Sequence, residues 1–299
     1  MDVGHWAWAL FTVMGAASQT IRNTAQRELT ARIGTAGATQ VRFLYGLPFS
    51  LLFLGAVVAF EGRPPALGGT FLLWTVAGAV AQVFATAFLL AAMRDRSFVV
   101  IVAYSKTEPV QVALFGLAVL GDPLTIGVIV AILAATFGVM LLSWPKRSDR
   151  DLPRNWMPAV LGIVAGSFFA LASVGFRGAI LTLETPSFVL AATTTLVVGL
   201  TIQTAITAVY MALFDRAAFI AVFVAWRTSI IAGFTGALAS QFWFLAFALE
   251  SAARVRTLGL VEILFAQLVS MRILRQGVRG GELLGLGLVI IGVVLVVNG

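Results

Sequence analysis

The sequence has 299 residues, of which 60% are hydrophobic and only 11% are charged, and its mean hydropathy is +1.00. A soluble domain keeps about a quarter of its residues charged, so this composition excludes a soluble globular protein and predicts helices immersed in lipid. The chain has no cysteine and one histidine, His5, which excludes disulfides, thiolate chemistry, three-ligand zinc sites and a serine–histidine–aspartate triad. We therefore expect no metal, no cofactor and no enzymatic activity.

The net charge of +7 would favour a nucleic-acid partner in a soluble protein. Here the basic residues lie mainly in short breaks between apolar runs, which is typical of topology signals in a membrane protein. The chain also lacks a basic tail and the interleaved aromatic and basic residues that grip single strands. We expect a lipid bilayer and a small-molecule substrate as partners rather than nucleic acid, with the oligomeric state left open.

Apolar runs follow one another along the whole chain, and a membrane helix needs about 20 apolar residues. The predicted spans are 4–22, 36–60, 70–93, 97–120, 124–144, 157–180, 185–213, 224–250, 256–273 and 280–298. Most breaks are short, so successive helices are expected to lie antiparallel and adjacent. The polar stretch 146–156 is longer, and it separates a first half, 1–145, from a second half, 157–299.

The two halves resemble copies of one another. A shift of 154 residues places Glu108 on Glu262, and a shift of 159 residues places Gln82 on Gln241. Five helices per copy is an odd number, so the second copy inserts in the opposite orientation to the first. The prediction is an all-α integral membrane protein with ten transmembrane helices in two inverted five-helix repeats.

A local motif lies where the fourth predicted span runs into the fifth. Residues 104–110 read YSKTEPV, and residues 120–124 read LGDPL. A Glu-Pro pair followed by a Leu-Gly-acidic turn resembles the tandem EamA-type domains of the drug/metabolite transporter superfamily. The second half keeps Glu262, but Ile263 replaces the proline. The resemblance implies two EamA-like repeats forming a ten-helix secondary transporter, often an exporter of amino acids or related metabolites.

Basic residues are distributed unequally between the two sets of alternating loops. Thirteen lie in or beside the loops that follow the odd-numbered spans: Arg22, Arg27, Arg32, Arg94, Arg96, Lys146, Arg147, Arg150, Arg154, Arg216, Arg272, Arg275 and Arg279. The opposite loops contain Arg63, Arg254 and Arg256. The positive-inside rule then predicts that both termini lie outside the cytoplasm. The arginine-rich composition and the resemblance favour a bacterial inner membrane.

Polar residues at the expected bilayer centre are the candidate substrate- or ion-binding site, because a charge there costs about 2.5–3.5 kcal/mol. The candidates are Tyr104, Lys106, Glu108, Glu262, Gln82, Gln241 and Trp243, together with Arg42 in the outer third of the second span. Pro109 is expected to break the fourth helix beside them, because it cannot donate its amide to the preceding turn. Broken helices near the midplane are common in the substrate sites of carriers.

A structural role for these charges is the alternative. Lys106 would then pair with Glu108, or Arg42 or Arg177 with either glutamate, and the two glutamines would hydrogen-bond between helices. Arg177 is also placed to extend its charge to the membrane interface.

The leading functional hypothesis is a secondary carrier that works by alternating access around a central midplane cavity. Glu108 or Glu262 is the candidate for proton coupling, because a carboxyl group at low dielectric binds a proton more readily. Basic, acidic and aromatic groups at one depth would suit an amino acid. The alternatives are an intramembrane enzyme acting on lipid-linked substrates and a non-transporting membrane scaffold.

Overall fold

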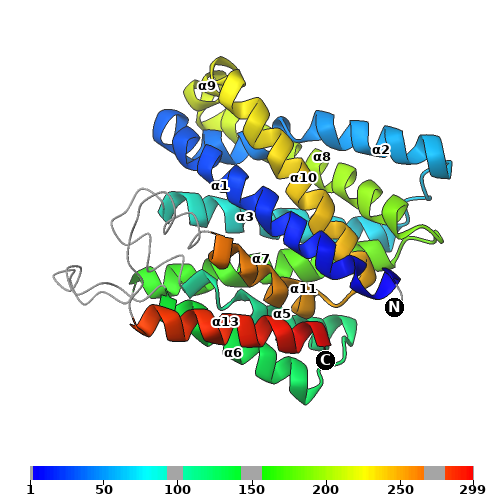
Figure 1. Cartoon of the computed structure of the whole chain (residues 1–299). Coiled ribbons are helices and arrows are strands. Elements are labelled where there is room, and N and C mark those ends of the chain that lie inside the picture. The colour runs from blue at the N-terminus through cyan, green and yellow to red at the C-terminus, as the bar shows by residue number, and fades with distance from the viewer. Residues whose placement is uncertain (1–2, 93–103, 143–156, 266–279, 299) are drawn as a thin grey trace.

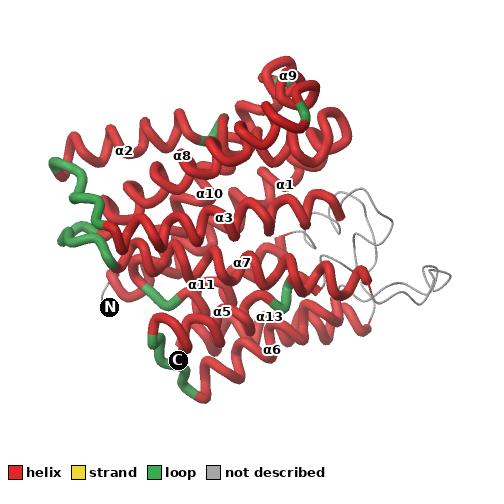
Figure 2. Tube along the Cα trace, turned by 180° about the vertical axis from the view of Figure 1, so that it is seen from behind, coloured by secondary structure: helices red, strands yellow, loops and turns green. Residues whose placement is uncertain are grey.

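The computed structural model describes residues 3–92, 104–142, 157–265 and 280–298, and all regular structure in these ranges is helical. The elements are α1 (Val3–Leu44), α2 (Leu47–Glu61), α3 (Gly69–Ala92), α5 (Glu108–Phe115), a π-helical turn (Gly116–Leu120), α6 (Ile126–Leu142), α7 (Met157–Leu181), α8 (Phe188–Phe214), α9 (Arg216–Val224), α10 (Trp226–Leu249), α11 (Ala252–Leu258), a 3₁₀ turn (Gly259–Val261) and α13 (Gly280–Asn298). Long helices run alongside one another in a bundle (Figures 1 and 2). The described residues therefore confirm the predicted all-α class.

The element α1 consists of two helices joined at Gly34, whose φ of 78° and ψ of 175° lie outside the helical region. The side-chain amide of Gln26 donates to the carbonyl oxygen of Ala38 at 3.3 Å. In a straight helix these residues would lie about 18 Å apart along the axis, so the chain reverses at Gly34. The first helix therefore continues beyond the predicted membrane span 4–22, through the polar residues that follow it, to this reversal.

Within the described ranges, five helical segments are long and apolar enough to cross a membrane by length and composition. They are Trp6–Glu61, Gly69–Ala91, Ala159–Leu181, Phe188–Phe214 and Trp226–Leu249. Large apolar side chains such as Leu73, Ile126 and Val224 are exposed on the outside of the bundle. Apolar surface on this scale fits contact with lipid. The arrangement is thus compatible with a membrane protein, and the ten-span topology stays a prediction.

Three helix pairs pack most extensively: α1 with α10, α3 with α7, and α6 with α13. Each pair joins one helix from before residue 145 to one from after residue 157. In Figure 1, α13 lies along α6 at one edge of the bundle, and α1 crosses the bundle beside α10. The two halves of the chain are therefore interlocked rather than separate bodies.

Glycines allow two of these pairs to approach closely. A Cβ atom at Gly138 of α6 would lie 2.7 Å from the carbonyl oxygen of Gly285 in α13, and one at Gly285 would lie 2.8 Å from that of Gly138. A Cβ atom at Gly175 of α7 would lie 2.8 Å from the Cα atom of Gly78 in α3. Side chains cannot fit at such distances, so these glycines set the spacing between the helices.

Candidate functional site

The helix that carries Glu108 is interrupted directly before this residue. Residues 106 and 107 form a turn, and α5 begins at Glu108. Pro109 then lies in the first turn of α5, where its missing amide is tolerated. The amide and hydroxyl of Thr107 donate to the carbonyl oxygen of Tyr104 at 3.1 and 2.7 Å. The break lies where Pro109 predicts it, and Tyr104, half-buried, is part of the turn.

The helix that carries Glu262 tightens into a 3₁₀ turn directly before this residue, without a proline. The helix α11 ends at Leu258, and the 3₁₀ turn Gly259–Val261 leads directly to Glu262. A Cβ atom at Gly259 would overlap the indole ring of Trp243, so only glycine fits at this position. The shift of 154 residues that places Glu108 on Glu262 therefore also places one helix break on the other.

Both glutamates are buried and ion-paired, each with a residue from the opposite half of the chain. Oε1 of Glu108 accepts from Nε of Arg256 at 2.5 Å. Oε1 of Glu262 pairs with Nζ of Lys106, and its Oε2 accepts from Nε2 of Gln19 at 2.6 Å. Removing one member of such a pair costs about 3–5 kcal/mol, because the other charge is left buried alone.

The partners expected from the sequence are therefore wrong. Lys106 pairs with Glu262 rather than with Glu108, and neither Arg42 nor Arg177 pairs with a glutamate. The sequence places Lys106, Glu108 and Glu262 at a common depth but does not say which helices are neighbours. Arg256 was assigned to a loop, although it is the partner of Glu108.

Arg42 is also buried at the centre, with 5% of its surface exposed. Its Nη1 donates to the hydroxyl of Thr86 at 2.8 Å, and its guanidinium lies 5.5 Å from the ring centroid of Phe43. No carboxylate of the described residues lies within ion-pair distance of it. A buried arginine satisfied only by a hydroxyl and a ring keeps most of its charge uncompensated.

Arg22 is the residue that sequence reasoning missed most clearly. It was assigned to the loop after the first span, but it lies within α1 and only 4% of its surface is exposed. Its Nη2 donates to the side-chain oxygen of Asn23 at 2.8 Å, and its Nε and Nη1 have no hydrogen-bond partner in the described part of the chain. The signal available was a polar stripe at helical spacing, formed by Gln19, Arg22 and Gln26.

Trp243 lies beneath the guanidinium of Arg256, which is 4.7 Å from the ring centroid. The ring is buried, and its Nε1 has no hydrogen-bond partner among the residues described. An arginine above an indole face is stabilised by the ring quadrupole as well as by its carboxylate partner. Trp243 therefore belongs to the central group of residues, as the sequence suggested.

The two repeat-matched glutamines have different surroundings. Gln82 accepts from Nε2 of Gln203 at 2.7 Å and lines a central cavity. Gln241 donates to the hydroxyl of Thr193 at 2.8 Å, which joins α10 to α8. Gln82 thus faces the cavity, whereas Gln241 links two helices.

A cavity of about 30 Å³ lies between α1, α3, α7, α10 and α11. Its polar lining consists of Gln19, Arg42, Gln82, Ser173, Ser240 and Arg256, and Trp243 is among the aromatic residues that complete it. A single water needs about 10–15 Å³ of such volume. The cavity is therefore large enough for about two waters and too small for a metabolite.

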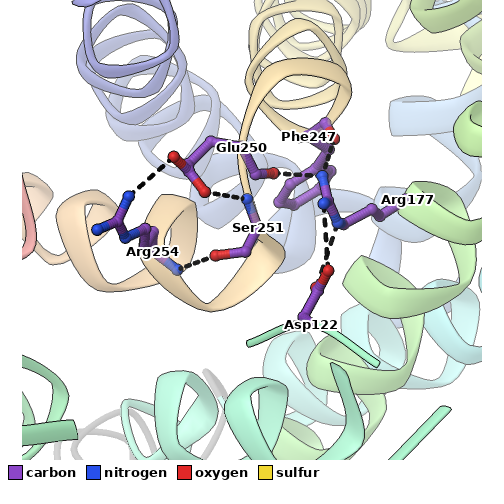
Figure 3. A network of polar contacts seen from close by, with 6 residues as sticks. All are labelled: Asp122, Arg177, Phe247, Glu250, Ser251 and Arg254. Atoms are coloured by element: carbon purple, nitrogen blue, oxygen red, sulfur yellow. Dashed lines mark hydrogen bonds and ion pairs between the residues drawn. The ribbon is translucent and has the colours of Figure 1, made fainter. Parts of the chain in front are cut away.

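A second charged network is centred on Arg177, which does not line this cavity (Figure 3). Nε and Nη2 of Arg177 each donate to a carboxylate oxygen of Asp122 at 3.2 Å, and Nη1 donates to the carbonyl oxygens of Phe247 and Glu250. The carboxylate of Glu250 accepts from Nη1 of Arg254 at 3.0 Å. Arg177 therefore joins α7 to two other segments near helix ends, and the extension of its charge to the membrane interface stays a prediction.

The revised positions of two arginines bear on the predicted orientation. The sequence pattern assigns Arg22 and Arg256 to loops on opposite sides, but Arg22 is buried within α1 and Arg256 is partly buried against Glu108. The polar stretch 146–156, which carries much of the remaining bias, lies outside the described residues. The extracytoplasmic placement of the termini stays a prediction.

Comparison with known proteins shows the fold. No family model and no curated protein matches the sequence. A solved structure, described only as a crystal structure of a protein, superimposes with a TM-score of 0.70 over 98% of this chain and 94% of that chain, at 12% sequence identity. Likeness at so low an identity carries no information on activity. The chain therefore shares its overall helical arrangement with a protein of known structure.

Proposed function

We propose that this chain is a secondary transporter of small metabolites that works by alternating access. The observation that carries the proposal is a pair of interrupted helices, one from each half, whose buried glutamates are paired across the halves beside a polar cavity. Secondary carriers build their substrate sites from discontinuous helices at the interface of two repeats. The polar centre is the substrate-binding region, and Glu108 or Glu262 is the site of any proton coupling.

The pattern of helix packing supports a twofold relation between the halves. Exchanging the halves turns the pair α1–α10 into the pair α7–α3 and leaves the pair α6–α13 unchanged. These are the three most extensive pairs in the bundle. An inverted repeat produces this pattern, since a twofold axis interchanges equivalent contacts. We therefore keep residues 1–145 and 157–299 as two opposed five-helix repeats.

The small size of the cavity supports a closed intermediate in the transport cycle. A space of about 30 Å³ does not admit an amino acid or a similar metabolite. The halves must therefore separate on one side or the other to admit a solute. The pairs Glu108–Arg256 and Glu262–Lys106 bind the halves together in this closed state, and a bound solute that competes for their cations would release them.

The setting of the proposed carrier follows from the sequence. We place it in a bacterial inner membrane as an exporter of small metabolites such as amino acids. Arg22 and Arg256 no longer count toward the positive-inside rule. We therefore propose that the termini lie outside the cytoplasm on the basis of the remaining basic loop residues alone.

Flux measurements on purified protein in liposomes test the proposal. Uptake of amino acids and organic anions is measured with and without an imposed proton gradient, for the parental protein, Glu108→Gln and Glu262→Gln. We expect solute flux in the parental protein and its loss in both variants, since each leaves a buried cation without its partner. Glu28→Gln is the matched control, because Glu28 forms an exposed pair with Arg32.

The alternatives give different results in the same assay. Folded variants that transport at the parental rate would remove the two glutamates from the mechanism. A protein that moves no solute, but converts a lipid-linked substrate supplied in the same liposomes, would be an intramembrane enzyme. One that does neither would be a scaffold, and the carrier proposal would be wrong.

A further inference from the structure

The buried centre carries more positive than negative charge. Its charged side chains are Arg22, Arg42, Lys106, Arg256, Glu108 and Glu262. Both carboxylates are occupied by Lys106 and Arg256. Within the described ranges, Arg22 and Arg42 have no carboxylate partner, so the centre holds an excess of two positive charges.

The two uncompensated arginines lie next to each other. A Cβ atom at Gly236 of α10 would lie 3.3 Å from Cδ of Arg22 and 3.7 Å from Cγ of Arg42. The two side chains therefore pack against the same glycine, one from each of the two helices that make up α1. Arg42 also lines the central cavity, as Arg256 does. Arg22, Arg42 and Arg256 lie close enough for their charges to repel one another, and we call these three residues the arginine cluster.

Such an arrangement is unfavourable in the absence of a ligand. Like charges repel strongly where the dielectric constant is low, and each buried guanidinium without a partner has lost its hydration. Nε and Nη1 of Arg22, which is 4% exposed, are two donors with no acceptor among the described residues. Guanidinium groups are well suited to carboxylates and phosphates, which they bind through two parallel hydrogen bonds.

We infer that the arginine cluster binds the anionic group of the transported solute, and that this solute is a small dianion, a dicarboxylate or a phosphate ester. The inference rests on the proposed carrier function and narrows its substrate class. A dianion would neutralise the excess of two charges. A zwitterionic amino acid brings no net charge and leaves the excess in place, so it fits the site less well than the sequence suggested.

Thermal unfolding of the detergent-purified protein tests this binding without a transport assay. Succinate, inorganic phosphate and the neutral analogue succinamide are added at matched ionic strength. We expect succinate or phosphate to raise the melting temperature by about 2–8 °C at saturation, and succinamide to leave it unchanged. If succinate raises the melting temperature more than phosphate does, the solute is a dicarboxylate. If phosphate raises it more, the solute is a phosphate ester.

Two variants connect the shift to the arginine cluster. Arg22→Gln and Arg42→Gln are expected to abolish the shift, whereas Arg32→Gln, at an exposed position, keeps it. The melting temperature without ligand shows whether each variant is folded. Equal shifts with succinamide and succinate, no shift with either dianion, or an unchanged shift in both folded variants would each overturn the inference.

The thermal-shift result and the liposome flux result can fail separately, so the two proposals are distinguishable. A protein that moves neutral or zwitterionic solutes in liposomes, but is not stabilised by a dianion, remains a carrier with a different substrate. A protein that is stabilised by a dianion through Arg22 and Arg42, but moves no solute, has the binding site without the proposed function.

Discussion

The two buried charged networks differ in how completely their charges are compensated. At the end of the bundle, Arg177 meets the carboxylate of Asp122 through two parallel hydrogen bonds and spends its remaining donors on backbone carbonyl oxygens (Figure 3). At the centre, Arg22 and Arg42 are as deeply buried but face no carboxylate of the described residues. The charge of Arg177 is compensated without a ligand, whereas the charges of Arg22 and Arg42 are not.

This difference separates a structural role from a functional one. A compensated pair holds its helices in a single arrangement and requires nothing from outside the protein. An uncompensated cluster is destabilising by itself and gains stability when an anion arrives. We expect the first network to respond to mutation mainly through the stability of the protein, and the second mainly through binding and transport.

The largest expected effect is the loss of stability on breaking the compensated network. Asp122→Asn keeps the shape of the side chain but leaves Arg177 buried without a charge partner. The free energy of unfolding should fall by about 3–5 kcal/mol, measured by thermal or denaturant unfolding in detergent. Glu28→Gln, in the exposed pair with Arg32, should cost at most about 1 kcal/mol. Equal effects of the two substitutions would contradict the assignment of Arg177 as a structural link.

A charge exchange across the centre sharpens the comparison. Lys106→Glu and Glu262→Lys should each destabilise the protein by about 3–5 kcal/mol, because each brings like charges together. The double variant restores opposite charges and should recover most of the stability in the same unfolding assay. Its transport should stay lost, since the carboxylate has moved to the other half. Recovery of transport together with stability would assign this pair to structure alone.

The smallest expected effect has the opposite sign. Arg22→Met replaces an uncompensated buried cation by an apolar side chain of similar length, and should raise the stability of the ligand-free protein by about 0.5–2 kcal/mol. Arg177→Met should lower it, because Asp122 is then left unpaired. Both are read as melting temperatures in a buffer free of dianions. A loss of stability in Arg22→Met would mean that Arg22 has a structural partner.

Much of this centre could be predicted from the sequence. Glu108 and Glu262 were found because acidic residues at matched positions of two apolar repeats have few structural explanations. Pro109 located one helix break, since a residue without an amide cannot continue the ladder of helical hydrogen bonds. Trp243 was found as an aromatic residue far from any helix end.

The partners of these residues could not be predicted. Arg22 and Arg256 fall at the very ends of apolar windows, where an arginine is usually a loop residue, and their burial depends on which helices pack together. The reversal of the chain at Gly34 brings Arg42 back beside Arg22; the apolar spans predict a reversal between residues 22 and 36, but not that the two arginines meet across it. The second helix break was missed as well, because a 3₁₀ turn that begins at Gly259 has no proline to announce it.

The most direct test of alternating access uses the absence of native cysteine. Ser240→Cys places a single thiol on the wall of the central cavity, and a membrane-impermeant maleimide is added to intact cells or to inside-out vesicles. We expect labelling from both sides, with rates that change when a transported solute is present, and labelling of the exposed control Arg63→Cys from one side only. Labelling of Ser240→Cys from one side alone, whatever the solute, would contradict the account.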